Sequence, residues 1–151
     1  MAWRQTIDRY SFAGMHIQKI SWQDTIAIRH RVLWPGESPA FCHVEGDETA
    51  WHYGVFVNGE LVSVASVFAD GDGARLRKFA TLPECQGRGI GSALLTHVLL
   101  VVREAGFTRF WCDARESASS FYQKFGLSTE GGVFYKDKIP YFKMGVMLAS
   151  A

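Results

Sequence analysis

The sequence predicts an α+β fold with a mixed, mostly antiparallel sheet of about six or seven strands and one parallel β-α-β pair. Two patterns lead to this prediction. In the first half of the chain, short β-rich runs follow one another with only tight turns between them, which is typical of an antiparallel meander. Between residues 74 and 114, a β-rich run leads through a glycine-rich turn and a long helix-forming run into another β-rich run. Such a crossover joins parallel strands.

Length and composition favour a single domain over residues 1–151. Of the 151 residues, 48% are hydrophobic and 21% are charged, which is ordinary for a globular protein with its own core. The formal net charge is only +1, so no global field indicates nucleic acid or an anionic membrane as a partner. No apolar run approaches the roughly 20 residues that span a bilayer, and no secretory-type segment is seen. With three widely spaced cysteines, typical of reduced thiols, we expect a cytoplasmic protein.

The first elements are a strand and a helix, followed by a loop. Residues 15–20 alternate enough to form a strand, and Ser21 can cap a helix that begins at Trp22. Pro35-Gly36 ends this helix. Residues 37–50 are polar and form a loop of a length that is often functional.

Three antiparallel strands are expected next, at residues 51–57, 61–68 and 74–81. Asn58-Gly59 joins the first two strands, since this dipeptide is a strong hairpin signal. The glycine-rich residues 70–73 form the second turn. These strands form the meander.

The second half contains the crossover. A helix is expected from about residue 91 to residue 105, with Gly106 as its left-handed cap, and residues 107–114 return as the parallel strand. Ser117 can cap a short helix that runs to residue 125. Two last strands are expected at residues 131–135 and 141–148.

The turn at residues 86–92, Gln-Gly-Arg-Gly-Ile-Gly-Ser, has the composition of a phosphate cradle. Its glycines let a ligand approach the backbone, and amides at a helix start have no intrahelical partner. No lysine follows Gly91, which excludes a mononucleotide loop. A dinucleotide fold needs the third glycine one residue later and more than one crossover, although Asp113 could bind a ribose. The remaining interpretation is the pyrophosphate of a long cofactor whose arm lies between the parallel strands.

Two segments resemble the signatures of one protein family. Residues 82–95 resemble the acyl-coenzyme A motif Gln/Arg-x-x-Gly-x-Gly/Ala of the GNAT N-acetyltransferase superfamily, whose positions fall on Gln86, Gly89 and Gly91. Residues 118–127 resemble its second signature, Ala-x-x-Phe/Leu-Tyr-x-x-x-Gly-Phe, with leucine in the last place. The two motifs occur in the expected order on the predicted strand, turn, helix, strand and helix.

The resemblance implies a GNAT-like fold that uses acetyl-CoA as co-substrate. In the family, the end of the strand before the turn offers backbone groups to pantetheine, and the turn holds the pyrophosphate. An arginine in the turn and a lysine on the later helix would pair with phosphates, and Arg115 stands where the family often has asparagine. The implied cofactor-binding residues are Phe79, Ala80, Thr81, Gln86, Gly87, Arg88, Gly89, Ile90, Gly91, Ser92, Arg115 and Lys124.

The resemblance also implies catalytic roles. Tyr122 matches the family's tyrosine near the sulfur atom, and a phenol with a pKa near 10 can protonate a departing thiolate. A main-chain amide at Ala80 or Thr81 would polarise the thioester carbonyl. The amine must lose a proton, and the candidates that could accept it, or bind a cationic substrate instead, are Glu45, Asp47, His52 and Asp113.

The expected activity is therefore direct acetyl transfer to a primary amine of a small molecule or peptide, without a covalent intermediate. Cys85 and Cys112 are poor nucleophiles because no histidine lies near either in sequence. Two alternatives stay open: Tyr122 as an ordinary core aromatic, and a non-catalytic domain of the same fold that binds coenzyme A or a partner. No metal is expected, since the loop after Cys42 has metal-ligand residue types without metal spacing. Homodimers are common in the family, while the sequence defines neither the acceptor nor the oligomeric state.

Overall fold

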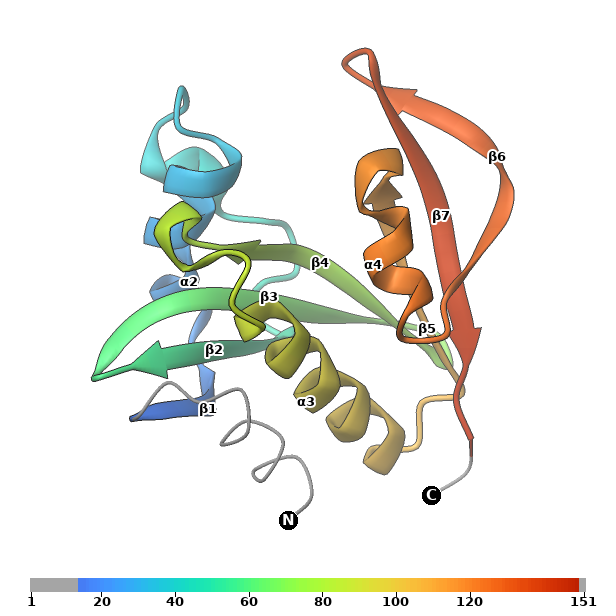
Figure 1. The fold of residues 1–151 in the computed structure, drawn as a ribbon, viewed down its shortest axis with the longest axis horizontal. Helices are drawn as coiled ribbons and strands as arrows, with labels where there is room; N and C mark the ends of the chain where they lie inside the picture. The colour runs from blue at the N-terminus through green and yellow to red at the C-terminus, as the bar shows by residue number, and fades with distance from the viewer. Residues whose placement is uncertain (1–13, 150–151) are drawn as a thin grey trace.

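The computed structural model describes residues 14–149, and Figure 1 shows these residues as a twisted sheet with helices on both faces. The strands are β1 (Met15–Ile20), β2 (Trp51–Val57), β3 (Glu60–Asp70), β4 (Gly73–Thr81), β5 (Arg109–Arg115), β6 (Ser128–Lys136) and β7 (Ile139–Met147). The helices are α2 (Trp22–Ile28), α3 (Ile90–Glu104) and α4 (Ser119–Gln123), and a π-helical turn (Arg29–Leu33) continues α2. None of the described helices is long and apolar enough to cross a membrane.

The sheet has the order β1-β2-β3-β4-β5-β7-β6. Every neighbouring pair is antiparallel except β4 and β5, which are parallel and joined by the crossover helix α3. The predicted mixed sheet with one parallel pair is therefore confirmed. Both hairpin turns of the meander are also confirmed, and Asn58 (φ 51°) and Gly59 (φ 82°) have the positive φ angles that a tight hairpin turn requires.

The parallel strands β4 and β5 stay together over only three residue pairs. Gly73, Ala74 and Arg75 pair with Arg109, Phe110 and Trp111, although β4 continues to Thr81 and β5 to Arg115. Beyond these pairs the strands separate, and Figure 1 shows the sheet opening between β4 and the side formed by β5, β7 and α4. Parallel strands normally remain hydrogen-bonded along their shared length, so the separation leaves one edge of β4 without its strand partner.

A bulge in β4 accompanies this separation. The register between β3 and β4 shifts between Val64 and Ser66, so that two residues of β4, Lys78 and Phe79, stand opposite one residue of β3. Lys78 has a φ of 54°, a left-handed conformation that costs an L-residue on the order of 1 kcal/mol. Bulges bend a strand and increase its twist, and this one lies just beyond the last pair that β4 makes with β5.

The caps at both ends of the helices follow mostly from local sequence. Ser21 caps α2 as predicted: its hydroxyl accepts from the amide of Asp24 at 3.3 Å, and the Asp24 carboxylate accepts from the amide of Ser21 at 3.2 Å. Gly106, with a φ of 92°, follows α3. The predicted cap of α4 at Ser117 is wrong. A short 3₁₀ turn occupies residues 116–118, and α4 begins after Ala118 with no side-chain cap.

The last two strands are longer than predicted. The sequence Lys-Asp-Lys-Ile-Pro reads as a loop, but Asp137 (φ 48°) and Lys138 (φ 68°) adopt left-handed conformations. These two residues alone make the hairpin turn, so β6 extends to Lys136 and β7 begins at Ile139. Such a turn usually contains glycine or asparagine, which is why the sequence did not indicate it.

The core lies on both faces of the sheet. The larger cluster packs α3 against one face, and its fully buried members include Val55, Leu94, Leu95, Val98, Val102 and Phe110. The smaller cluster packs α2 and the π-helical turn against the other face around Ile28, Val64 and Ala80. Three layers result, with the sheet in the middle.

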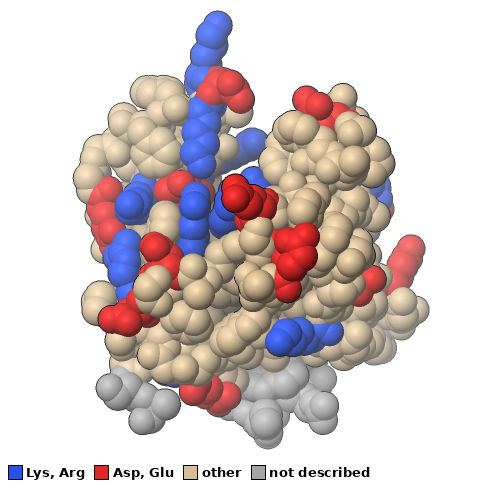
Figure 2. All heavy atoms as spheres, turned by 180° about the vertical axis from the view of Figure 1, so that it is seen from behind, with Lys and Arg blue, Asp and Glu red and all other residues tan. Residues whose placement is uncertain are grey.

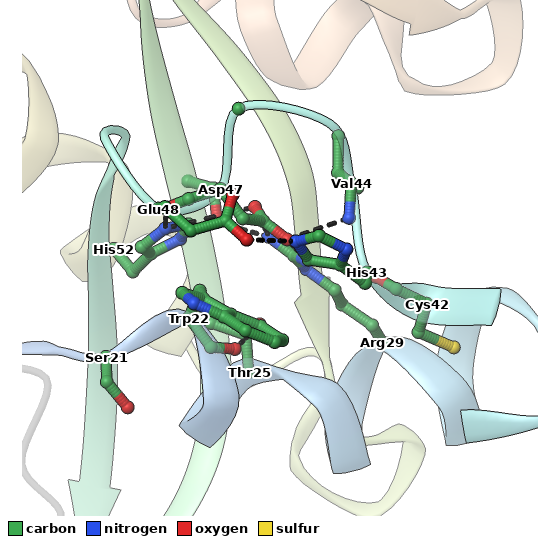
Figure 3. A network of polar contacts seen from close by, with 12 residues as sticks. Ser21, Trp22, Thr25, Arg29, Cys42, His43, Val44, Asp47, Glu48 and His52 are labelled. Carbon is green, nitrogen blue, oxygen red and sulfur yellow. Dashed lines mark hydrogen bonds and ion pairs between the residues drawn. The ribbon is translucent and has the colours of Figure 1, made fainter. Parts of the chain in front are cut away.

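A buried polar network ties the loop after α2 to the sheet. Arg29 is fully buried and forms a bidentate pair with Asp47, with nitrogen–oxygen distances of 2.7 and 2.9 Å. The same guanidinium donates to Ser66 Oγ at 2.9 Å and to the Cys42 carbonyl at 3.1 Å. Figure 3 shows Arg29 reaching up from the start of the π-helical turn to the loop that carries Asp47. Because a buried arginine needs such partners, the network fixes the path of the loop.

His52 completes this network. Its ring nitrogens contact Ser66 Oγ at 2.7 Å and the Asp47 carbonyl at 2.8 Å. Burial lowers the pKa of His52, with the Arg29 charge adding to the effect, so the ring is neutral near pH 7. Burial alone would raise the pKa of the Asp47 carboxyl, but hydrogen bonds from Arg29 and the Val44 amide outweigh it and lower that pKa. The pair is therefore Arg⁺ and Asp⁻ beside a neutral imidazole.

We expect Asp47→Ala to destabilise the fold by about 3–5 kcal/mol, because it leaves the buried Arg29 charge without its partner. Urea unfolding followed by tryptophan fluorescence measures the loss. Glu45→Ala is the matched control, since Glu45 is exposed in the same loop, and it should change stability by less than about 0.5 kcal/mol. Equal effects of the two substitutions would contradict a supporting role for the network.

Candidate active site

Two cavities meet where β4 and β5 have separated. The first, which we call the turn cavity, has a volume of about 500 Å³ and lies between the end of β4, the glycine turn and α4. The second, which we call the basic cavity, has a volume of about 530 Å³ and lies between β4, β5, the β6–β7 hairpin and the π-helical turn. Phe79, Ala118 and Tyr122 line both. The two cavities therefore adjoin at these three residues.

The turn cavity has the features of an anion site. Gly87 (φ 75°) and Gly89 (φ 83°) adopt left-handed conformations that favour glycine. Gly89 is the N-cap of α3 and offers no side chain to the first amides of the helix. These amides have no intrahelical partner, and the positive end of the helix dipole lies beside them. The turn can thus hold a phosphate group.

Most of the expected cofactor-binding residues are brought together here. The turn cavity is lined by Phe79, Ala80, Thr81, Gln86, Gly87, Gly89, Ile90, Gly91 and Ser92, together with Cys85, Ala118, Phe121 and Tyr122. Gln86 also holds the turn against β4, since its side-chain amide donates to the Thr81 carbonyl at 3.0 Å.

Three expected cofactor contacts lie elsewhere. Arg88 is exposed on the turn and is not part of the lining, and Lys124 is exposed at the end of α4 and lines neither cavity. Arg115 lines the basic cavity instead. Strand alternation places Arg115 on the same face of β5 as Trp111 and Asp113. Cys112 and Ala114 face the α3 core, and they also line the basic cavity.

Tyr122 lies at the junction of the two cavities. Its side chain is 9% exposed, and burial, together with its hydrogen bond to the Cys112 thiol, raises the pKa of its phenol far above the usual value. The phenol is therefore protonated at neutral pH and can donate a hydrogen bond or a proton, although its raised pKa makes it a weaker acid than an exposed tyrosine. Burial likewise raises the pKa of the Cys112 thiol to about 12, so this cysteine carries almost no thiolate.

The candidates for accepting the proton of the amine divide into two groups. Asp113 lines the basic cavity, where its carboxylate pairs with Arg75 at 3.0 Å and with Lys136 at 3.3 Å. Glu45, Asp47 and His52 line neither cavity.

Glu45, Asp47 and His52 line neither cavity because of the path that the loop 37–50 takes. Arg29 draws this loop onto the sheet, where Asp47 and His52 are 1% and 3% exposed. Glu45 is exposed to solvent on the same loop. These three residues therefore do not share a site with Tyr122.

The basic cavity also contains charged residues that the sequence did not single out. Its cationic lining consists of Arg75, Arg77, Lys78, Arg115 and Lys136, and its acidic lining of Asp113 and Asp137. Burial, together with the nearby positive charges of Arg77 and Lys136, lowers the pKa of Lys78 to about 8. Figure 2 shows Lys and Arg side chains in and beside the hollow between the two lobes of the molecule. The alternation of Arg75 and Arg77 with apolar residues was the signal available in the sequence.

Among residues 14–149, no group of three or more His, Cys, Asp and Glu side chains is arranged to hold a metal ion. The site consists of the glycine turn, the open edge of β4, the phenol at the junction and the charged lining of the basic cavity.

Comparisons with known proteins agree with this geometry. The family model described as "Acetyltransferase (GNAT) domain" matches residues 40–148. An uncharacterized N-acetyltransferase of Bacillus subtilis (strain 168), YitI, is 34% identical over 129 residues, which cover 80% of this chain and 87% of the relative. The chain therefore belongs to the GNAT acetyltransferase family.

Solved structures support the same fold. The ribosomal-protein-S18-alanine N-acetyltransferase from Escherichia coli superposes with a TM-score of 0.76 at 20% identity, covering 91% of this chain and 96% of that one. Ard1 from Thermoplasma volcanium superposes with a TM-score of 0.74 at 21% identity, covering 91% and 99%. At these identities the likeness defines the fold and not the acceptor.

The cysteines provide a test of the site's electrostatics. We expect iodoacetamide at pH 8 to alkylate Cys85 at least about tenfold faster than Cys112, because Cys85 is half-buried on the turn cavity whereas Cys112 is 2% exposed with a raised pKa. Peptide mass mapping over time measures both rates. Cys42, fully buried, is the internal control for an unreactive thiol. Fast labelling of Cys112 would contradict the protonated state described here.

Proposed function

We propose that the protein transfers an acetyl group from acetyl-CoA to the primary amine of an acceptor, by direct attack of the amine on the thioester. The observation that carries this proposal is the position of Tyr122, a buried and protonated phenol where the two cavities meet. A phosphate site alone would fit many ligands. Here the phosphate site is connected to a proton donor by the open edge of β4. This arrangement suits a thioester such as acetyl-CoA, because its departing thiolate must be protonated.

Coenzyme A fits the turn cavity in chemical terms. The glycine turn suits its pyrophosphate, because it combines glycine-permitted approach with the amides of residues 90–92, which have no intrahelical partner at the start of α3. The edge of β4 beyond Arg75, which β5 leaves open, suits the extended pantetheine arm, whose amides can pair with the strand as an added strand would. In this arrangement residues 79–81 lie beside the thioester.

The chain supplies two groups for the transfer step. As the amine nitrogen forms its bond to the carbonyl carbon, a main-chain amide of Ala80 or Thr81 stabilises the negative charge on the oxygen. As the carbon–sulfur bond breaks, Tyr122 gives its proton to the departing sulfur. The proton lost by the amine passes to water or to Asp113, which is the one predicted acceptor that lines the basic cavity.

A covalent route through cysteine is less consistent with the site. Cys112 lines the basic cavity, but its raised pKa keeps it as a thiol, and the group that it contacts is the Tyr122 phenol, which is not a base. Nucleophilic cysteines need a lowered pKa or an adjacent base. Direct transfer needs neither.

The test of this function is a panel of primary amines, amino acids and short peptides, assayed for release of free thiol from acetyl-CoA. We expect thiol release that depends on both acetyl-CoA and an acceptor, with N-acetylated product confirmed by mass spectrometry. Calorimetry with acetyl-CoA and NADH accompanies the panel, and binding of NADH without binding of the thioester would contradict the assignment. Binding of acetyl-CoA without turnover of any acceptor would favour the non-catalytic alternative. A cytoplasmic location and a homodimer stay predictions.

We expect Tyr122→Phe to lower kcat by about 100-fold, because general acid catalysis contributes at least that factor, while the affinity for acetyl-CoA changes less than about threefold. Steady-state kinetics and calorimetry separate the two quantities. Tyr53→Phe is the matched control, since Tyr53 is also buried with a raised pKa but packs on His97 of α3. A Tyr122→Phe enzyme with full kcat would show that another group protonates the sulfur.

A further inference from the structure

The basic cavity has an uneven charge balance. Five cationic and two acidic side chains line it, although the whole chain has a net charge of only +1. Asp113 is shared by Arg75 and Lys136, which pair with it at 3.0 and 3.3 Å. The Asp113 carboxylate thus forms ion pairs with two of the five cations and lies between them.

The other three cations have aromatic neighbours or solvent instead of carboxylates. Arg77 lies over the Phe68 ring at 5.3 Å, and Lys78 lies over the Trp34 ring at 4.3 Å. Arg115 is exposed at the end of β5. Within residues 14–149, no carboxylate lies at ion-pair distance from any of these three side chains.

The positive charges of these side chains also repel one another. Burial, together with the charges of Arg75 and Arg29, lowers the pKa of Arg77 against the opposing effect of the Asp47 and Asp113 carboxylates. Burial, together with the charges of Arg77 and Lys136, lowers the pKa of Lys78. The protein therefore holds positive charge in a partly buried place where it is unfavourable. A bound anion would relieve this repulsion and would gain charge-assisted hydrogen bonds from groups that are already in position.

We propose that the acceptor is a small amine that also carries a carboxylate or phosphate group, and that Arg77, Lys78 and Arg115 bind this anionic group in the basic cavity. The proposal rests on the proposed function, because it takes the basic cavity as the acceptor site. The cavity shares Phe79 and Tyr122 with the turn cavity, and this shared wall orients the acceptor: its anionic end lies among the cations and its amine lies toward the thioester. The same positive charges would repel a polycationic amine.

The first experiment compares acceptors that differ in charge. Glycine is paired with glycinamide, β-alanine with its amide, and phosphoethanolamine with ethanolamine, with spermidine as the polycation. Thiol release from acetyl-CoA gives kcat/KM, expressed per unprotonated amine because the members of a pair differ in amine pKa. We expect the anionic member of at least one pair to be favoured by tenfold or more, and the carboxylate and phosphate pairs show which anion is preferred.

Single substitutions test which side chains cause the preference for anionic acceptors. Arg77→Met and, separately, the exposed Arg115→Met should each reduce the preference for the anionic member at least threefold, with coenzyme A affinity within about threefold of the wild type. Arg103→Met is the matched control, since Arg103 is exposed in the last turn of α3 and lines neither cavity. It should leave the preference unchanged. A preference for neutral amines or spermidine would overturn the proposal while acetyl transfer itself stands.

Binding of citrate tests the anion site without turnover. Titration followed by calorimetry should show that citrate binds the wild type and Arg103→Met equally, and Arg77→Met and Arg115→Met at least threefold more weakly. If no acceptor releases thiol but this order holds, the proposed function fails and the anion site stands. Equal citrate binding by all four proteins, or none by any, overturns the anion site whatever the thiol assay gives.

Discussion

Three residue pairs hold β4 to β5, and the separation of the strands beyond Arg75 and Trp111 shapes every part of the site. Separation leaves the edge of β4 open, and it makes room for the turn cavity and the basic cavity to meet at Tyr122. The bulge at Lys78 accompanies it and requires a left-handed lysine. A sheet paired along its full length would be more regular, but it would have no place for a ligand between its strands.

One wall of this opening depends on the buried network around Arg29. The bidentate pair of Arg29 and Asp47 fixes both the loop and the start of the π-helical turn. Leu33 at the end of this turn and Trp34 directly after it contribute to the wall of the basic cavity. Trp34 in turn lies under the Lys78 ammonium. Asp47 thus affects the site through packing, as a positioning residue, at a distance from the proposed chemistry.

Local signals in the sequence predicted most of the fold. Ser21, Asn58-Gly59 and Gly106 each determine a cap or turn through their own backbone preferences, and the glycine turn with its following helix defined the crossover. The last hairpin was harder to predict, because Asp137 and Lys138 adopt a turn that their residue types do not favour. The pairing of β6 with β7 up to Lys136 and Ile139 defines that turn, and no local pattern in the sequence indicates it.

The site was predictable where it consists of backbone and a motif, and unpredictable where it depends on long-range contacts. Nine expected residues of β4 and the glycine turn do line one cavity, because neighbours in sequence stay neighbours on a strand and a turn. Asp47 and His52 have the residue types of a catalytic pair, yet whether such residues face a cleft or the interior depends on Arg29, 18 residues away from Asp47. Strand alternation, by contrast, could have placed Arg77 and Arg115 beside the cleft.

In the proposed arrangement coenzyme A lies between the separated strands, with its pyrophosphate on the glycine turn. Amide hydrogen exchange with and without coenzyme A is the decisive measurement. We expect slower exchange at residues 79–81 and 87–92 on binding, and unchanged exchange at residues 43–52, where the buried network already protects the loop. Protection confined to other segments, with the turn and the end of β4 exchanging as before, would contradict this arrangement.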